Sequence, residues 1–530
     1  MRLQKQTIFI FTLILGIALF HNLGFFVALF SNSYEQFTGM IGLSRGDKTV
    51  YLSMIEQVKQ GSFLVQNLFT KEVSSGLFHP LWIVLGFVAK IFSLQAKTIF
   101  HASSFVFGVG LLWYLFSISK HLFVTHKQRI LFLCGLGFLG GLGRMSLLFY
   151  NPELFAGDAF FEVLPVDLWY SEAFSYLTLH HSPLFILSQG LMIGAWWLLI
   201  QKNVTTKQSF LAATLLLVLG FIHPFDFVPW WVVMMVFSIL VLNTKTTTFK
   251  SLLKTLLPSI ISSGIVTTYY ILLLQNNPSI AAWNEQNIML PPSMFSLLVG
   301  YGLMWPLAFL GIHYSKKFVQ KRVWYFLISW FLTIPFLMYA PIHVSRRLVS
   351  SFGIIMALLS VYGLLFWWER YGKQVWQRGI SSVFHMAASL VFVLLLIFGP
   401  LYQIIDSTNL VLHREFPGYI SGEQFVITQL LKEAPADSIV VAEPFLANTI
   451  PGTAGLRVWL GHDVQTVDFE HRLAQLQRLY IIEWSEWHDE FIQNEKVSHI
   501  VWPTENNDRI PDTWNEIFRG EQLTLWGVGY

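Results

Sequence analysis

The residues that could carry chemistry are few in this chain, and they lie in short segments between long apolar runs. Only 12% of the 530 residues are charged, whereas 54% are hydrophobic. Ionisable groups are costly next to lipid, so a recurring set of them at one membrane face indicates a functional site. The alternative is that these segments simply face water. The candidates are Asp47, Glu72, Asp167, Glu172, His180, His181, His223, Asp226, Arg346 and Arg347.

Asp47 follows Gly46 at the start of a segment with a helical pattern. A carboxylate in this position could accept the proton of an acceptor nucleophile. It could equally serve as the N-cap of a helix that begins at Lys48, and the two roles are compatible. Apolar residues recur on one face of this predicted helix, which favours a helix that lies in the membrane interface. They are Val50, Tyr51, Met54, Ile55 and Val58.

Arg346 and Arg347 form a basic pair at the predicted outer end of an apolar span. Basic residues normally collect on the cytoplasmic side, so a pair on the other side needs a cause. One cause is snorkelling of the long side chains. The other is anion binding, because a guanidinium can hold a phosphate with two parallel hydrogen bonds. We expect phosphate binding here, with help from His343.

Asp167 and Glu172 are close in sequence to His180 and His181. Carboxylates and imidazoles are ordinary ligands of divalent cations, so a metal site is one interpretation. The spacing matches no known metal motif, however, and loop structure or substrate binding is the alternative. The segment from His223 to Asp226 contains a proline and a charge, which predicts a tight turn whose acid could face the same site. The sequence predicts no cofactor with certainty.

Long apolar runs must position these residues, and they predict a polytopic membrane protein. A helix needs about 20 apolar residues to cross the hydrocarbon. The run 208–242 is too long for one span and is broken by the His223–Asp226 turn, so it predicts a hairpin of two spans. The other predicted spans are 7–30, 98–119, 130–150, 183–200, 251–274, 292–312, 323–340, 349–368 and 380–402.

The distribution of basic residues orients these spans. Lys and Arg gather in alternate loops, which are therefore predicted to be cytoplasmic, whereas the loop 151–182 contains acids and no Lys or Arg. Eleven spans with the N-terminus in the cytoplasm fit this alternation. The apolar segment 79–94 is short, and placing it across the membrane would invert every later loop. We predict that it is a re-entrant or interfacial helix, with crossing as the alternative.

The composition changes after residue 402, and the remainder is polar. Short β-rich pieces at 438–442, 457–460 and 497–502 alternate with helical pieces at 424–432 and 469–482. We predict a transmembrane domain over 1–402, with a first outer loop and interfacial helices over 31–97. A small extracytoplasmic α/β domain follows over 403–530. The net charge of +3 excludes nucleic acid as an expected partner, and Cys134 alone forms no disulfide framework.

The order of these parts resembles the GT-C type of membrane glycosyltransferase. The similarity is carried by the acid in Arg45–Tyr51 and by the apolar segment that opens with His79 and Pro80. A basic turn at Lys120, a second acidic loop and a soluble end domain complete it. Short phrases around Asn67–Glu72, Asn448–Pro451 and Gly461–Asp463 also resemble a bacterial GT-C-like group with mostly unassigned substrates.

The resemblance implies a function. The donor would be a sugar on a polyprenyl phosphate, and the acceptor a glycan, a lipid or a protein at the outer membrane face. Asp47 would be the catalytic base of an inverting transfer, with Asp167 or Glu172 assisting. Arg346 and Arg347 would bind the lipid phosphate. The second outer loop, 151–182, lacks the Asp-x-Asp pattern of the family, and this departure leaves metal dependence open. The alternatives are a non-catalytic scaffold of the same fold and a lipid or solute transporter.

Overall fold

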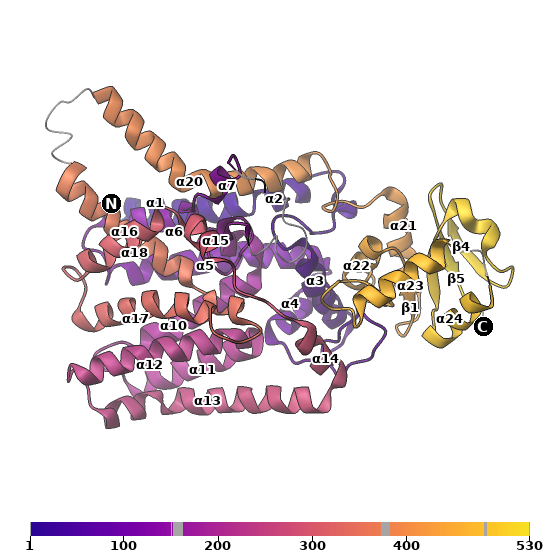
Figure 1. Ribbon diagram of the computed structural model, residues 1–530, viewed down its shortest axis with the longest axis horizontal. Helices are drawn as coiled ribbons and strands as arrows, with labels where there is room; N and C mark the ends of the chain where they lie inside the picture. The colour runs from indigo at the N-terminus through magenta and orange to yellow at the C-terminus, as the bar shows by residue number, and fades with distance from the viewer. Residues whose placement is uncertain (1, 150, 152–162, 373–381, 482–484, 529–530) are drawn as a thin grey trace. The chain divides into compact units, whose positions relative to one another are not determined.

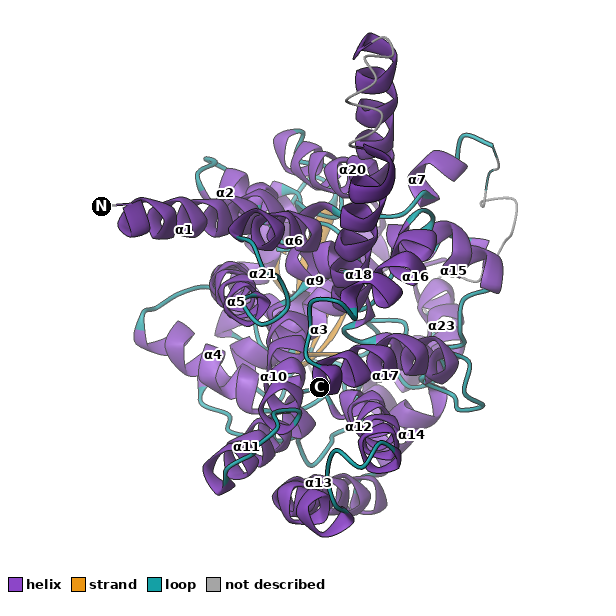
Figure 2. Ribbon diagram, turned by 90° about the vertical axis from the view of Figure 1, so that its left-hand side faces the viewer, coloured by secondary structure: helices purple, strands orange, loops and turns teal. Residues whose placement is uncertain are grey.

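The computed structural model describes residues 2–149, 151, 163–372, 382–481 and 485–528. Helices dominate the chain, and strands occur only near its C-terminus within the described residues (Figures 1 and 2). The contacts divide the chain into two units. Unit 1 contains Met1–Gly24, Ser103–Thr268 and Ile288–Thr408, and unit 2 contains Phe25–Ala102, Tyr269–Asn287 and Asn409–Tyr530.

Unit 1 is a bundle of apolar helices. Within it, α16 packs against α18, α10 against α11, and α12 against α17 (Figure 1). The helix α18 is almost wholly buried, which explains why it is apolar on every side. The helices that lie wholly or mostly in unit 1 are α1 (Arg2–His21), α5 (Ala96–Ser119), α6 (His126–Phe138), α7 (Gly143–Ser146), α9 (Ser175–His181), α10 (Pro183–Leu199), α11 (Thr206–Ile222), α12 (Phe227–Asn243), α13 (Phe249–Asn276), α15 (Met294–Tyr301), α16 (Met304–Ser315), α17 (Lys321–Met338), α18 (Phe352–Trp367) and α20 (Ser382–Leu412).

The predicted hairpin in the run 208–242 is confirmed. The helix α11 ends at Ile222, the short 3₁₀ helix η4 (Pro224–Asp226) forms the turn, and α12 begins at Phe227. Proline cannot donate the backbone hydrogen bond that a continuous helix needs, and His223 before it leaves the helical conformation.

Three predicted continuous spans are interrupted in the structure. The segment 7–30 is divided between α1 and α2 (Leu23–Leu29), with a break after His21. The segment 130–150 contains α6, which ends at Phe138, and the short α7 beyond a glycine-rich break. A Cβ on Gly141 would lie 1.5 Å from the carbonyl oxygen of Gly300, so this close approach requires glycine. The segment 292–312 is likewise split into α15 and α16, which bend by 71° at Gly302. Its φ of 43° is in the left-handed region that favours glycine.

Five described helices are long and apolar enough to cross a membrane, or up to seven if each bent pair is one span. The helices α10 and α11 are shorter, with 17 residues each. The structure thus supports a polytopic protein without fixing the predicted number of eleven. The segment 79–94 contains α4 (Pro80–Ile91), whose 12 residues extend about 18 Å, well short of the hydrocarbon thickness.

Unit 2 joins the first loop to the C-terminal region. Its helix α3 (Arg45–Gln60) packs against α4 on one side and α22 (Pro444–Thr453) on another, so most of its faces are buried in protein. The apolar face that the sequence predicts for the interface, including Ile55 and Val58, belongs to this protein core. The unit also contains α14 (Pro278–Gln286), and α20 runs past the predicted domain boundary at 402.

The C-terminal region of unit 2 has a five-stranded mixed sheet of order β2-β1-β3-β5-β4. The strands are β1 (Ile439–Val441), β2 (Arg457–Val458), β3 (His499–Pro503), β4 (Asn515–Arg519) and β5 (Leu523–Gly527), with helices α21 (Gly422–Leu430), α23 (Phe469–Ile481) and α24 (Glu486–Glu495). Parallel pairing of β1 with β2 and β3 follows from the helices between them, whereas β4 and β5 form an antiparallel hairpin. The predicted α/β character is confirmed, but β4, β5 and α24 were not predicted.

Candidate functional site

Several loops of unit 1 meet around Arg346 and Arg347, which lie on the 3₁₀ helix η5 (Ser345–Val349). The Nη1 atom of Arg347 is 3.5 Å from Oε1 of Glu172. The Arg347 guanidinium also lies over the Phe225 ring at 5.2 Å, and that of Arg346 lies over the Trp169 ring at 5.0 Å. Residues from three distant segments therefore form one group, which we call the arginine cluster.

The arginine cluster contains two guanidinium groups, and Glu172 is an acid that contacts Arg347. Arg347 pairs with Glu172, both arginines act electrostatically on Tyr170, and the buried Nε–H of Arg347 has no hydrogen-bond partner among the described residues. The buried hydroxyl of Tyr170 is likewise without a partner there. Burial and then the charge of Glu172 raise the pKa of Tyr170, against the opposing effect of the arginines. Tyr170 therefore remains a neutral hydrogen-bond donor, and the cluster is suited to an anion.

The turn at η4 adjoins this cluster. Its His223 and Asp226 are buried, and Nδ1 of the imidazole lies 3.0 Å from Oδ1 of the carboxylate, in an orientation that makes no hydrogen bond. The Phe185 ring contacts the rings of both His181 and His223. The predicted proximity of these turn residues to the basic pair is therefore present within unit 1.

Asp167 has a different environment from Glu172. Its Oδ2 accepts a hydrogen bond of 3.0 Å from the backbone N–H of Gly143. A Cβ on Gly143 would lie 1.9 Å from the other carboxylate oxygen, so glycine is required for this packing. Burial raises the pKa of Asp167 from 3.8 to about 8, although backbone hydrogen bonds oppose it. This acid anchors a loop, and its catalytic role stays a prediction.

The histidines after this loop contact other groups, and the described residues give the metal interpretation no support. A ring nitrogen of His180 is hydrogen-bonded to the carbonyl of His21 at 2.7 Å, and the His181 ring stacks on Phe185. Among the residues that the structure describes, no group of three or more His, Cys, Asp or Glu could hold a metal ion. The carboxylates of the loop are directed to Gly143 and Arg347 instead.

Asp47 lies in unit 2, in the first turn of α3. The helix begins at Arg45 with Ser44 at the N-cap, so the interpretation of Asp47 as the N-cap is wrong. Its side chain is 46% exposed, and its Oδ1 lies 3.7 Å from Nε2 of His462. The other ring nitrogen of His462 lies 2.9 Å from Oδ1 of Asp463. We call these three residues the Asp47–His462 group.

The two neighbouring acids favour the charged form of His462. Burial lowers its pKa, but interaction with the carboxylates of Asp463 and Asp47 outweighs this effect and raises the pKa from 6.5 to about 9. The same interaction lowers the pKa of Asp463. The sequence analysis included His462 only in the Gly461–Asp463 segment that resembles the family, and it predicted no role for this residue. Its position between a glycine and an acid in a polar segment was the available signal.

Glu72 is tied to the C-terminal sheet. Its carboxylate accepts hydrogen bonds from the hydroxyl of Thr70 and from the guanidinium of Arg472. Burial works against ionisation of Glu72, but these contacts prevail and lower its pKa. Arg457 donates to the carbonyls of Asn67, Thr70 and Glu72 at 2.7–3.0 Å. The substrate-binding role predicted for Glu72 stays a prediction, beside this structural one.

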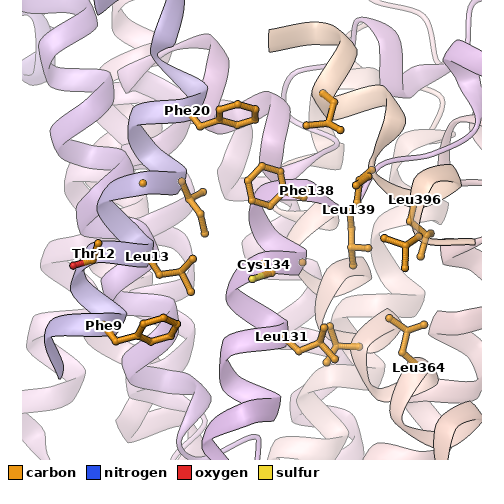
Figure 3. Close-up of a pocket in the computed structure, with 17 residues that line it drawn as sticks. Phe9, Thr12, Leu13, Phe20, Leu131, Cys134, Phe138, Leu139, Leu364 and Leu396 are labelled. Atoms are coloured by element: carbon orange, nitrogen blue, oxygen red, sulfur yellow. The ribbon is translucent and has the colours of Figure 1, made fainter. Parts of the chain in front are cut away.

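Unit 1 also contains an apolar cavity of about 800 Å³. Figure 3 shows side chains of α1 and α6 that point into the same space, with Phe20 and Phe138 on facing helices. Residues of α18 and α20, such as Leu364 and Leu396, complete the lining. Apart from Thr12 and Cys134, the lining residues are hydrocarbon side chains or glycines, so the cavity suits an apolar chain.

The fold places the chain among known structures. ArnT from Cupriavidus metallidurans in the apo state matches with a TM-score of 0.53 and 12% identity over 96% of this chain and 97% of that one. The oligosaccharyltransferase AglB from Archaeoglobus fulgidus, in complex with an inhibitory peptide and a dolichol-phosphate, matches with a TM-score of 0.53 and 12% identity over 94% and 69%. The arabinofuranosyltransferase AftD from Mycobacteria matches with a TM-score of 0.50 and 10% identity over 92% and 40%.

These structures are GT-C glycosyltransferases, and the chain has their fold, as predicted from its sequence. It is a multi-pass membrane protein of this architecture with a small C-terminal sheet. ArnT has also been solved with undecaprenyl phosphate bound, and that structure matches with a TM-score of 0.50. No family model matches the chain, and no curated protein matches it.

Proposed function

We propose that this protein is a membrane glycosyltransferase that takes a sugar from a polyprenyl-phosphate donor. The sugar passes to an acceptor at the outer face of the membrane. The observation that carries the proposal is the GT-C fold, shared over nearly the whole length of ArnT, together with the arginine cluster. Solved structures of ArnT and AglB contain prenyl phosphates, which supports the same class of ligand here.

The arginine cluster would bind the donor phosphate. The buried Nε–H of Arg347 has unused hydrogen-bonding capacity among the described residues, and Arg346 is its neighbour on η5. Tyr170 would donate a further hydrogen bond. As the bond from sugar to phosphate breaks, negative charge grows on the leaving phosphate. Fixed donors held in protein stabilise that charge more in the transition state than in the ground state.

The apolar cavity of unit 1 would receive part of the donor's prenyl chain. Its lining of phenylalanine, leucine and isoleucine side chains offers no partner for a headgroup. Each CH₂ moved from water to such a surface contributes about 0.8 kcal/mol, so part of one chain would contribute substantially to retention. Gly16 borders the cavity with open space before it, which leaves room for the chain.

Asp47 would act as the general base. Its half-exposed carboxylate would take the proton from an acceptor hydroxyl while that oxygen bonds to the anomeric carbon. The phosphate leaves from the opposite side with the bonding electron pair, so the configuration inverts. The proposal places the N-terminus in the cytoplasm, and the C-terminal domain outside, with the donor's phosphate at the outer face.

Binding of undecaprenyl phosphate to the purified protein in mild detergent tests the donor site. We expect this probe to raise the melting temperature of the wild type, and the double variant Arg346→Ala/Arg347→Ala to lose at least about tenfold in apparent affinity. Dioleoyl phosphatidic acid carries its phosphate on two acyl chains in place of a prenyl chain, and it should bind more weakly than undecaprenyl phosphate. Equal affinity of wild type and double variant for undecaprenyl phosphate would contradict the proposed site.

A further inference from the structure

His462 connects an acid of the first loop with an acid of its own loop. Its Nε2 faces Oδ1 of Asp47 at 3.7 Å, and its Nδ1 lies 2.9 Å from Oδ1 of Asp463 and 3.1 Å from the backbone nitrogen of Val464. The imidazole thus bridges the two carboxylates within unit 2. The side chain of His462 is only 5% exposed, while that of Asp463 is 70% exposed. An almost buried imidazolium between two more exposed acids is an unusual use of a charged side chain, because burial disfavours its charge.

The surroundings fix the imidazole in this position. The Phe69 ring contacts it edge-on, with centroids 6.1 Å apart. A Cβ added to Gly46 would lie 3.2 Å from Nε2, so the glycine before Asp47 lets the ring approach the helix. The backbone of the His462 loop is held by Thr466, whose hydroxyl donates to the carbonyl of Phe69 at 2.6 Å. The ring therefore has little freedom to move away from Asp47.

We propose that His462 is a positioning residue for Asp47, which keeps the carboxylate ionised and oriented for proton transfer. The inference rests on the proposed function for the role of Asp47, but the ion pair itself can be tested without any substrate. His462 touches neither the donor nor the acceptor in this account, and it acts through Asp47. At 3.7 Å the contact is longer than a hydrogen bond, as is common for catalytic contacts before substrate binds.

The other charged groups at this position do not replace His462. Arg45 and Lys48 lie on the same helix as Asp47, and Asp463 is the acid on the facing loop. The ammonium of Lys48 is buried and donates to the carbonyl of Ile41. Burial, with a contribution from Arg45, lowers the pKa of Lys48 to about 7 even though Asp47 opposes this shift. The imidazole of His462, in contrast, faces Asp47 from a second segment of the chain.

The test is the pH dependence of carbodiimide labelling at Asp47, which mass spectrometry can quantify on the full-length protein. A carbodiimide with glycine ethyl ester modifies the protonated carboxyl, and the side chain of Asp47 is exposed enough to react. We expect the labelling midpoint of His462→Gln to lie about one pH unit above that of the wild type, since a cation at this distance is removed. His471→Gln, at an exposed histidine on α23 of the same domain, should leave the midpoint unchanged.

A second variant keeps the inference testable if His462→Gln does not fold. Gly46→Ala retains the histidine and displaces its ring, so it should raise the midpoint by a smaller amount. An unchanged midpoint in a folded His462→Gln or Gly46→Ala variant would overturn the inference.

Turnover separates this inference from the proposed function. If transfer needs Asp47 and the acid side of its pH profile moves up in His462→Gln, both stand. If transfer needs Asp47 and neither the labelling midpoint nor the pH profile responds to His462→Gln, the role of His462 is wrong and the proposed function stands. If labelling responds but Asp47→Asn keeps wild-type turnover, the ion pair exists, and both the general base and the positioning role are overturned.

Discussion

The arginine cluster of unit 1 and the Asp47–His462 group of unit 2 both pair an acid with a cation, but they bury opposite partners. In unit 1 the Glu172 side chain is 9% exposed and Arg347 is 18% exposed. In unit 2 the cation His462 is 5% exposed, whereas Asp47 is 46% exposed. Unit 1 therefore has a nearly buried acid beside a guanidinium group, and unit 2 has a nearly buried imidazole beside an accessible carboxylate.

This difference assigns the two groups different chemistry. On the proposed function, the guanidinium group beside the buried acid donates to an anion, and the exposed acid beside the buried imidazole accepts a proton. Binding a phosphate and removing a proton from a hydroxyl are the two tasks that glycosyl transfer from a lipid phosphate requires. The comparison predicts that variants of the two groups fail in different ways.

The largest effect is expected for Asp47→Asn, which keeps the shape of the side chain and removes its basicity. Transfer should fall by about 10²–10⁴-fold, the usual contribution of a general base, while donor binding stays unchanged. Two measurements check this prediction. Turnover of the lipid-linked donor, once mass spectrometry has identified it, reports the loss of transfer, and undecaprenyl-phosphate binding reports the unchanged donor site. Wild-type turnover would remove Asp47 from the mechanism.

The next effect concerns Arg347, through its contact with Glu172. Arg347→Ala should weaken undecaprenyl-phosphate binding by about ten- to a hundredfold, because it removes charge-assisted hydrogen bonds. Arg347→Lys keeps the charge without the planar group and should lose less. Arg519→Ala, which removes an exposed arginine on β4, is the matched control. If Arg347→Ala lost no more affinity for undecaprenyl phosphate than Arg519→Ala, the arginine cluster would not be the anion-binding group of the pair.

A smaller effect is expected from filling the apolar cavity. Gly16→Leu places a side chain in the open space beside the cavity and should weaken undecaprenyl-phosphate binding by about tenfold, as a few CH₂ contacts are lost. Gly110→Leu on α5 also enters open space but does not line the cavity, so it should bind as the wild type does. Equal affinity of both variants would exclude the cavity from donor binding.

The smallest effect concerns Asp167, which burial keeps protonated. Its pKa is raised from 3.8 to about 8 in the folded protein, so the unfolded chain binds fewer protons between these values. The stability from this group is complete below about pH 4 and is lost as the pH rises toward about 8. Asp167→Asn should make the melting temperature less dependent on pH, by about 3 °C or more between pH 5 and pH 8. Parallel pH dependence in both proteins would show that Asp167 is ionised when folded.

Much of the fold follows from the sequence because apolar runs and turn residues act locally. Pro224 ends one helix and starts another through its own covalent geometry, so the hairpin around it was predictable. The breaks at Gly141 and Gly302 were not, because each depends on a distant segment that approaches the backbone. The edge strand β4 was not predictable either, because most of it is exposed and it lacks a buried pattern that distinguishes a strand from a loop.

The sequence allowed the residues of the candidate site to be predicted from their types, but it did not show which of them contact one another. Arg346 and Arg347 stand out because their charge conflicts with their predicted side of the membrane. That Glu172 contacts Arg347 while Asp167 turns to Gly143 depends on a few ångströms of loop geometry. Likewise, His462 lies more than 400 residues from Asp47 in the numbering, and only the packing of α3 with the C-terminal region brings them together.

The most direct measurement is the identification of lipids that co-purify with the protein in mild detergent, by mass spectrometry. It compares the wild type with Asp47→Asn and with Arg346→Ala/Arg347→Ala. We predict a polyprenyl phosphate or its glycoside on the wild type, more of the unspent glycoside on Asp47→Asn, and neither on the double variant. The same bulk phospholipids on all three proteins, and no polyprenyl phosphate on any, would contradict the account.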